Sequence, residues 1–186
     1  MEWILPGSTL RGEREQADQI GDVFSALFLA GGLTLSQTSQ ITGLDTYTIQ
    51  NWVKRGFLPS PVHKRYDMER VCRLLNMNLL RGIMPLEQIV LLMKYLNGDL
   101  ADERDDLVDD AVLYFYFVRL AARARYIGGT KTWDEALEEI TLNYSEVVPG
   151  AREKLIKVLK IMLTVWVANR LRMEAETMLC ELTEPK

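Results

Sequence analysis

The sequence predicts a mainly α-helical protein with one small two-stranded hairpin. Apolar residues recur at three- and four-residue spacing over most of the 186-residue chain, which is the helical period. Glycine and proline divide this pattern into segments of helical length, and only one segment carries an extended pattern. We expect an N-terminal helical extension over 1–32, a compact unit over 33–98 and a helical C-terminal bundle over 99–186.

The first residues lead into a helix. Residues 1–12 contain Pro6-Gly7 and Gly12, and we interpret them as irregular. Residues 13–30 have one apolar face and predict a helix, which Gly31-Gly32 ends.

Two short helices follow, separated by a single glycine. Thr34 or Ser36 caps a helix that runs to Thr42 and stops at Gly43. Asp45 or Thr46 opens the next helix, which ends at Gly56. Two helices joined by one tight glycine turn are typical of a helix-turn-helix.

The segment 57–66 changes character. Pro59 and Pro61 favour an extended backbone before them, and Val62 to Tyr66 returns as a second strand, which predicts a small two-stranded wing. Helices are then predicted over 67–81 and from Pro85 to Asn97, with Pro85 in a first turn where it is tolerated.

The C-terminal half begins with an acidic stretch at 99–110, which we interpret as the domain boundary. Three helices are predicted near 107–127, 132–143 and 150–180, separated by glycine-containing breaks.

An aromatic run occupies residues 114–117 (YFYF). A small-molecule effector pocket between helices is one interpretation. We favour bundle core and dimer interface, because four consecutive aromatic residues of a helix cannot all point into one core.

Charge is distributed unevenly along the chain. The net charge is −4, but residues 33–96 hold eight Lys and Arg against four Asp and Glu, a net charge of +4, and the remainder carries −8. A basic unit on an acidic body is expected when one part of a protein contacts a polyanion.

Several classes are not expected. Cys72 and Cys180 are far apart and His63 is the single histidine, so we expect no disulfide framework, no zinc site and no cofactor. We interpret both cysteines as small buried hydrophobic residues. With one histidine and no phosphate loop, we do not expect an enzyme.

Membrane insertion is not expected either. The apolar stretch 111–122 is shorter than the roughly 20 residues of a membrane span and contains Arg119. The stretch 155–168 contains Lys157 and Lys160. With no signal-peptide pattern, a cytoplasmic location is the expectation.

Residues 33–96 resemble the DNA-binding half of MerR-type regulators, a winged helix-turn-helix. The resemblance is carried, in order, by LTLSQT at 33–38, TGL at 42–44, KRGFLP at 54–59, KRYD at 64–67 and RGIMPLEQI at 81–89. More narrowly, IQNWVK at 49–54 with Pro59, Pro61 and Lys64-Arg65-Tyr66 resembles an uncharacterised bacterial family that contains this unit. The wing is shorter than in typical MerR proteins, and Gln50-Asn51 replaces their Arg and aromatic pair.

The predicted helix 45–55 then becomes the recognition helix. Its inner face holds Ile49, Trp52 and Val53, which leaves a polar outer face whose Gln and Asn can pair with an adenine edge. We expect Thr46, Tyr47, Gln50, Asn51 and Lys54 to contact the major groove. We expect Arg55, His63, Lys64 and Arg65 to hold the phosphate backbone.

These observations predict a cytoplasmic, homodimeric, sequence-specific transcription regulator that binds double-stranded DNA. A dimer suits a two-fold operator. The alternative is a protein-interaction module that has kept the helix-turn-helix shape without specific DNA binding.

Overall fold

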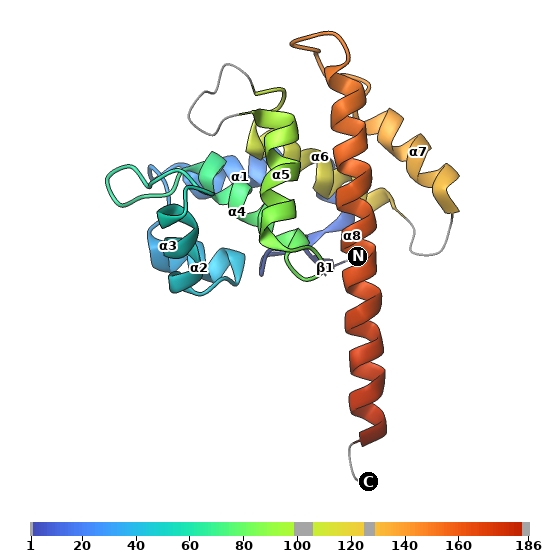
Figure 1. Ribbon diagram of the computed structural model, residues 1–186, viewed down its shortest axis with the longest axis horizontal. Coiled ribbons are helices and arrows are strands. Elements are labelled where there is room, and N and C mark those ends of the chain that lie inside the picture. Colours follow the sequence, from blue (N-terminus) through green and yellow to red (C-terminus); the bar gives the residue numbers. More distant parts are fainter. Residues whose placement is uncertain (1, 99–105, 125–128, 184–186) are drawn as a thin grey trace.

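The computed structural model describes residues 2–98, 106–124 and 129–183, without the side chains of 129–132 and 183. The chain is mainly helical, as predicted, with one small antiparallel sheet (Figure 1). The helices are the 3-10 helix η1 (Arg14–Gln19), α1 (Ile20–Phe28), α2 (Leu35–Thr42), α3 (Thr46–Lys54), α4 (Met68–Leu80), α5 (Leu86–Asn97), α6 (Asp110–Arg123), α7 (Gly129–Ile140) and α8 (Ala151–Thr183).

The regular sheet lies at the N-terminus, where the sequence predicts an irregular lead. Strands β1 (Glu2–Ile4) and β2 (Arg11–Glu13) pair antiparallel, with Trp3 opposite Gly12. Each strand has three residues, too few to show an alternating pattern. The Tyr114 hydroxyl of α6 donates to the Pro6 carbonyl at 2.9 Å and fixes the connecting loop.

The segment 57–66 is less regular than the predicted two-stranded wing. Among the described residues it forms one isolated bridge within itself, between Val62 and Arg65, and Tyr66 bridges back to Leu33. Pro59 and Pro61 supply no backbone N–H, so a longer ladder cannot form. We call residues 57–66 the α3–α4 loop.

The core is centred on α4, whose residues 71–77 are all buried. It packs most extensively on α6, and the buried apolar residues form one continuous cluster from Trp3 to Trp166. The unit over 33–98 and the C-terminal half therefore share packing, and the division at 98/99 stays a prediction.

The aromatic run 114–117 packs against other elements of the same chain. The ring pairs are Phe24–Tyr114, Phe24–Phe115, Tyr116–Tyr144 and Phe117–Trp166, with centroids 5.4, 5.5, 6.5 and 6.1 Å apart. The run therefore belongs to the bundle core, and each ring has a partner within one protomer; its predicted role in a dimer interface stays a prediction.

Helix α8 is far longer than the other helices. Its 33 residues correspond to about 50 Å, and residues 171–182 are all exposed and project from the body (Figure 1). Cys72 is buried as predicted, but Cys180 lies in this exposed part, so its predicted burial is wrong. No helix in the described ranges is long and apolar enough to cross a membrane.

Candidate nucleic-acid interface

A tightly fixed turn joins α2 to α3. Gly43 ends α2 with φ of 68°, in the left-handed region that favours glycine. The Ser39 hydroxyl donates to the Leu44 carbonyl at 2.6 Å, which holds the turn to the preceding helix. These contacts set the direction in which α3 leaves the turn.

Asp45 is the N-cap of α3. Its carboxylate accepts hydrogen bonds from the Thr48 amide at 2.7 Å and the Thr48 hydroxyl at 2.8 Å. These bonds hold the pKa of Asp45 below its ordinary value. The carboxylate is thus committed to the helix N-terminus, and its negative charge is offset there.

Helix α3 is divided into an inner and an outer face, as its sequence predicts. Ile49 is 0% exposed and Trp52 6%, whereas Tyr47 is 75% exposed. The predicted groove-reading residues are exposed, except for the half-buried Asn51: they are Thr46, Tyr47, Gln50, Asn51 and Lys54. A polar face of this kind offers hydrogen-bond donors and acceptors to a partner.

The tip of the α3–α4 loop is a two-residue turn. Val62 and Arg65 exchange both backbone hydrogen bonds, at 3.0 and 2.8 Å. Between them, His63 and Lys64 have φ of 48° and 62°, values that non-glycine residues seldom adopt. Both side chains are exposed, so this backbone conformation presents a cation and an imidazole at the tip.

Two arginine side chains hold this loop in place by hydrogen bonds to backbone carbonyls. Arg65 Nη1 donates to the Gly32 carbonyl at 2.8 Å, and Arg70 Nε donates to the Ser60 carbonyl at 2.8 Å. A Cβ on Gly32 would lie 2.9 Å from the Tyr66 carbonyl oxygen, so only glycine permits this approach. Arg65 is therefore engaged within the fold as well as exposed.

Arg55 also has partners within the fold. Its guanidinium lies 3.5 Å from the Glu87 carboxylate of α5 and 4.5 Å from the centroid of the Phe57 ring. Both members of the ion pair are well exposed, so the pair contributes little stability. Glu87 therefore places one negative charge beside Arg55, one of the predicted phosphate-contacting residues.

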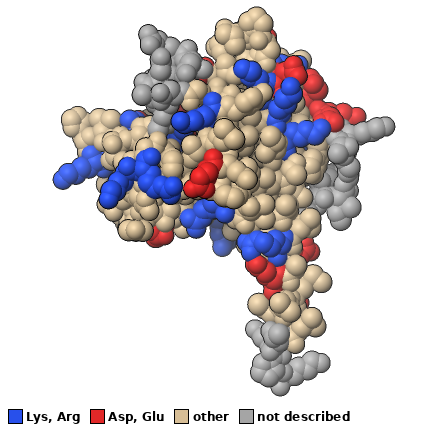
Figure 2. Space-filling view, viewed as in Figure 1, with Lys and Arg blue, Asp and Glu red and all other residues tan. Residues whose placement is uncertain are grey.

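Figure 2 shows lysine and arginine side chains on the side of the molecule that carries α3 and the α3–α4 loop, and others on the same face towards α8. Among the described residues, Lys54 and Lys64 make no ion pair, so their charges are available to a polyanion. The structure brings α3 and the α3–α4 loop to the same side of the fold (Figure 1).

A buried ion pair anchors the loop to the C-terminal half. Arg73 of α4 donates from Nε to the Phe57 carbonyl at 3.0 Å and from Nη1 to Asp110 Oδ2 of α6 at 2.9 Å. The two side chains are 7% and 13% exposed. Burial raises the pKa of Asp110, and the Arg73 guanidinium opposes that shift.

Sequence reasoning missed Arg70 and Arg73 as supports of the loop. Their three-residue spacing puts them on one face of α4, which was a usable signal. The partners of Arg73 could not be deduced, because Phe57 and Asp110 lie 16 and 37 residues away in the chain.

The described residues contain no cluster of the ligands that a metal ion needs. In the part of the chain that is described, no group of three or more His, Cys, Asp or Glu is placed to bind an ion.

The family described as "Domain of unknown function (DUF1836)" matches residues 17–117. No curated protein and no solved structure matches the chain. The matched residues run from η1 into α6 and so include both the α2–α3 pair and the Arg73–Asp110 anchor.

Proposed function

Because this chain belongs to the DUF1836 family, whose function is unknown, we propose from its own residues that it is a bacterial-type transcription regulator that binds specific DNA sequences as a homodimer. The α2–α3 pair is the helix-turn-helix, and the α3–α4 loop is a reduced wing. The MerR-like resemblance of residues 33–96 belongs to this proposal.

One observation supports the proposal above the others: α3, which has an exposed polar face, lies on the same side of the fold as the loop with its cationic tip. Tyr47 is 75% exposed, and Lys54 and Lys64 make no ion pair with another described residue. A helix needs such a face to enter the major groove, and phosphate contacts beside it set its register.

The proposed contacts divide by chemistry. Gln50 and Asn51 read base edges, and Thr46 and Tyr47 contact a thymine methyl group or phosphates. Lys54, His63 and Lys64 contact phosphates directly. Arg55 and Arg65 hold the loop in place through Phe57 and the Gly32 carbonyl, so we assign them a positioning role first.

The test is selection of fragmented genomic DNA by the purified full chain, at two salt concentrations. A recovered site with two-fold symmetry that survives the higher salt is expected. Changing Lys54 and Lys64 to Ala should then weaken binding and lower the magnitude of the salt slope by about 0.9 for each phosphate that the protein no longer neutralises. Gln50→Ala should instead relax the sequence preference at one position.

Arg11→Ala is the control for each single lysine change, since Arg11 is exposed on β2 and pairs only weakly with Glu2 at 3.4 Å. It removes one cation without touching the proposed interface. If the Lys54 and Lys64 changes affect binding no more than Arg11→Ala does, the interface is assigned wrongly. If the chain retains no DNA at low salt and instead purifies with one stoichiometric partner, the protein-interaction alternative holds.

A further inference from the structure

The C-terminal part of α8 has the composition of a helix that is covered in the functional state. Residues 171–182, here called the α8 overhang, extend about 18 Å beyond the body. They expose several large apolar side chains: Leu171 53%, Met173 53%, Met178 61%, Leu179 60% and Leu182 83%. A lone helix of this length has little stability of its own, so a partner helix or groove is expected to cover it.

A stripe of apolar and small side chains runs along the exposed face of α8 with alternating three- and four-residue steps. Beyond Lys157 it comprises Ile161, Thr164, Ala168, Leu171, Ala175, Met178 and Leu182. Each of these side chains is exposed, from the body into the α8 overhang. This 3.5-residue period is the pattern of a seam between two packed helices.

The body end of the stripe borders an open apolar groove between α5 and α8. The groove has a volume of about 830 Å³. Its α5 wall exposes Leu91 at 68% and Tyr95 at 49%, and its α8 wall contains Val158 and Val165. Apolar side chains of this size at the surface indicate a binding site.

We propose that the α8 overhang of a second copy of this chain occupies this groove, with the two α8 helices antiparallel. The interface is symmetric, because each copy supplies one overhang and one groove. This proposal rests on the homodimer of the proposed function and names the surface through which it forms. The dimer itself does not depend on DNA binding.

One antiparallel register gives every residue of the stripe a facing residue in the other copy. It puts the two-fold axis beside residues 169 and 170 and lets each residue of one copy face its counterpart in the other. The facing pairs are Ala168–Leu171, Thr164–Ala175, Ile161–Met178 and Lys157–Leu182. Small residues thus face large ones, and the Lys157 stem covers Leu182 while its ammonium stays in water.

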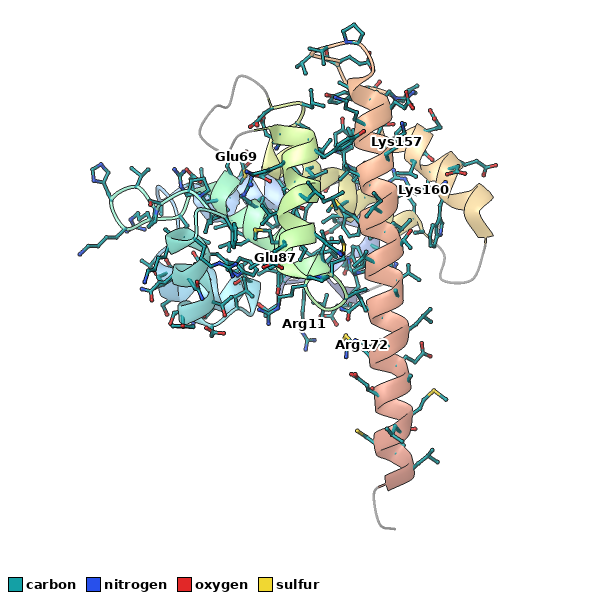
Figure 3. The ribbon with its side chains drawn as sticks, viewed as in Figure 1. Arg11, Glu69, Glu87, Lys157, Lys160 and Arg172 are labelled. Carbon is teal, nitrogen blue, oxygen red and sulfur yellow. The ribbon has the colours of Figure 1, made fainter. Side chains whose placement is uncertain are left out.

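The flanks of the stripe agree with the same register. On the α5 side, Leu179 of one copy comes beside Val158 of the other, inside the groove. On the α7 side, Glu181 comes beside Lys160, which already holds Asp134 at 2.6 Å. Figure 3 shows Lys157 and Lys160 on the half of α8 beside the body and Arg172 on the other half. A parallel pair would join the overhangs but leave both grooves empty.

The first experiment measures the monomer–dimer equilibrium of the full chain by sedimentation equilibrium, without DNA. We compare Leu171→Glu with Met173→Glu, because both residues are 53% exposed but only Leu171 lies in the stripe. Leu171→Glu should weaken the dimer at least about 100-fold, since a symmetric interface carries the change twice. Met173→Glu should leave it within a few-fold of the unchanged protein.

The second experiment tests the register by disulfide formation, in a Cys180→Ser background. Thr164→Cys with Ala175→Cys should give a covalent dimer under mild oxidation, because those residues face each other across copies and are too far apart within one helix. Thr164→Cys with Thr177→Cys is the control, and its second cysteine lies off the stripe.

A chain that stays monomeric at concentrations of about 100 μM would overturn the proposal. So would equal cross-linking of the two cysteine pairs, or a dimer that Leu171→Glu leaves intact. The DNA test is separable, because Lys54 and Lys64 lie far from the stripe in sequence and on another element. Loss of DNA binding in a protein that is still dimeric would refute the proposed function alone.

Discussion

At the scale of single residues, the loop tip combines an unfavourable backbone conformation with an exposed cationic side chain. A two-residue hairpin turn with both central φ values positive favours Asn followed by Gly. This chain has His63 and Lys64 there, at φ of 48° and 62°. The sequence signals for such a turn are therefore missing, and it could not be predicted from the residues.

Replacing the tip by the favoured pair, His63→Asn with Lys64→Gly, should stabilise the fold. Relief of the left-handed conformation at Lys64 is expected to raise the free energy of unfolding by about 1 kcal/mol. Chemical denaturation measures the gain, and the same variant should bind DNA more weakly, because the tip cation is removed. A variant no more stable than the unchanged chain would mean that the turn is not strained.

At the scale of elements, the sequence predicts helices better than strands. Helix α2 begins and ends where its capping residues Thr34 and Gly43 indicate, since both are immediately next to the helix in the chain. The predicted wing is reduced to one bridge, and the sheet lies instead at β1 and β2. Strand pairing depends on residues distant in the chain, so a short strand carries little of its own signal.

The contact between α4 and α6 makes stability depend on pH through Glu69. Glu69 Oε2 accepts from the Ala111 amide at 3.0 Å. The residue as a whole is exposed, but its carboxyl lies against α6. Desolvation there, and then the nearby Asp109, Asp110 and Asp67, raise the pKa of Glu69 from 4.5 to about 7, and the hydrogen bond from Ala111 opposes the shift. The folded state therefore binds a proton that the unfolded state releases, and this carboxyl should reduce stability as pH rises from about 4.5 to about 7.

Glu69→Gln should remove that part of the pH dependence, because an amide keeps the acceptor and cannot ionise. Urea unfolding at pH values on either side of the window is the measurement, with Glu135→Gln on the exposed face of α7 as control. The Glu69→Gln variant should gain relative stability at the higher pH only. An equal effect at both pH values would show that ionisation of Glu69 is not responsible.

At the scale of the whole molecule, the candidate site could be predicted only in part from the sequence. The outer face of α3 follows from the spacing of Ile49 and Trp52 on the inner face. The arginine contacts that hold the α3–α4 loop could not be predicted, because Arg65 bonds to Gly32 33 residues away and Arg73 bonds to Asp110 37 residues away. Such pairs are products of tertiary packing, and a single sequence does not reveal which residues meet.

The Arg73–Asp110 pair, together with the shared core of α4 and α6, has a consequence for how the chain comes apart. Elements that share their burial open together, so backbone amides of α4 and α6 should exchange with deuterium at similar, globally limited rates. A fragment confined to residues 33–98 should fail to show a cooperative melting transition, since it leaves the Arg73 guanidinium buried without its carboxylate. Hydrogen exchange should therefore find one cooperative unit, in which a change at α6 also affects the base of the α3–α4 loop.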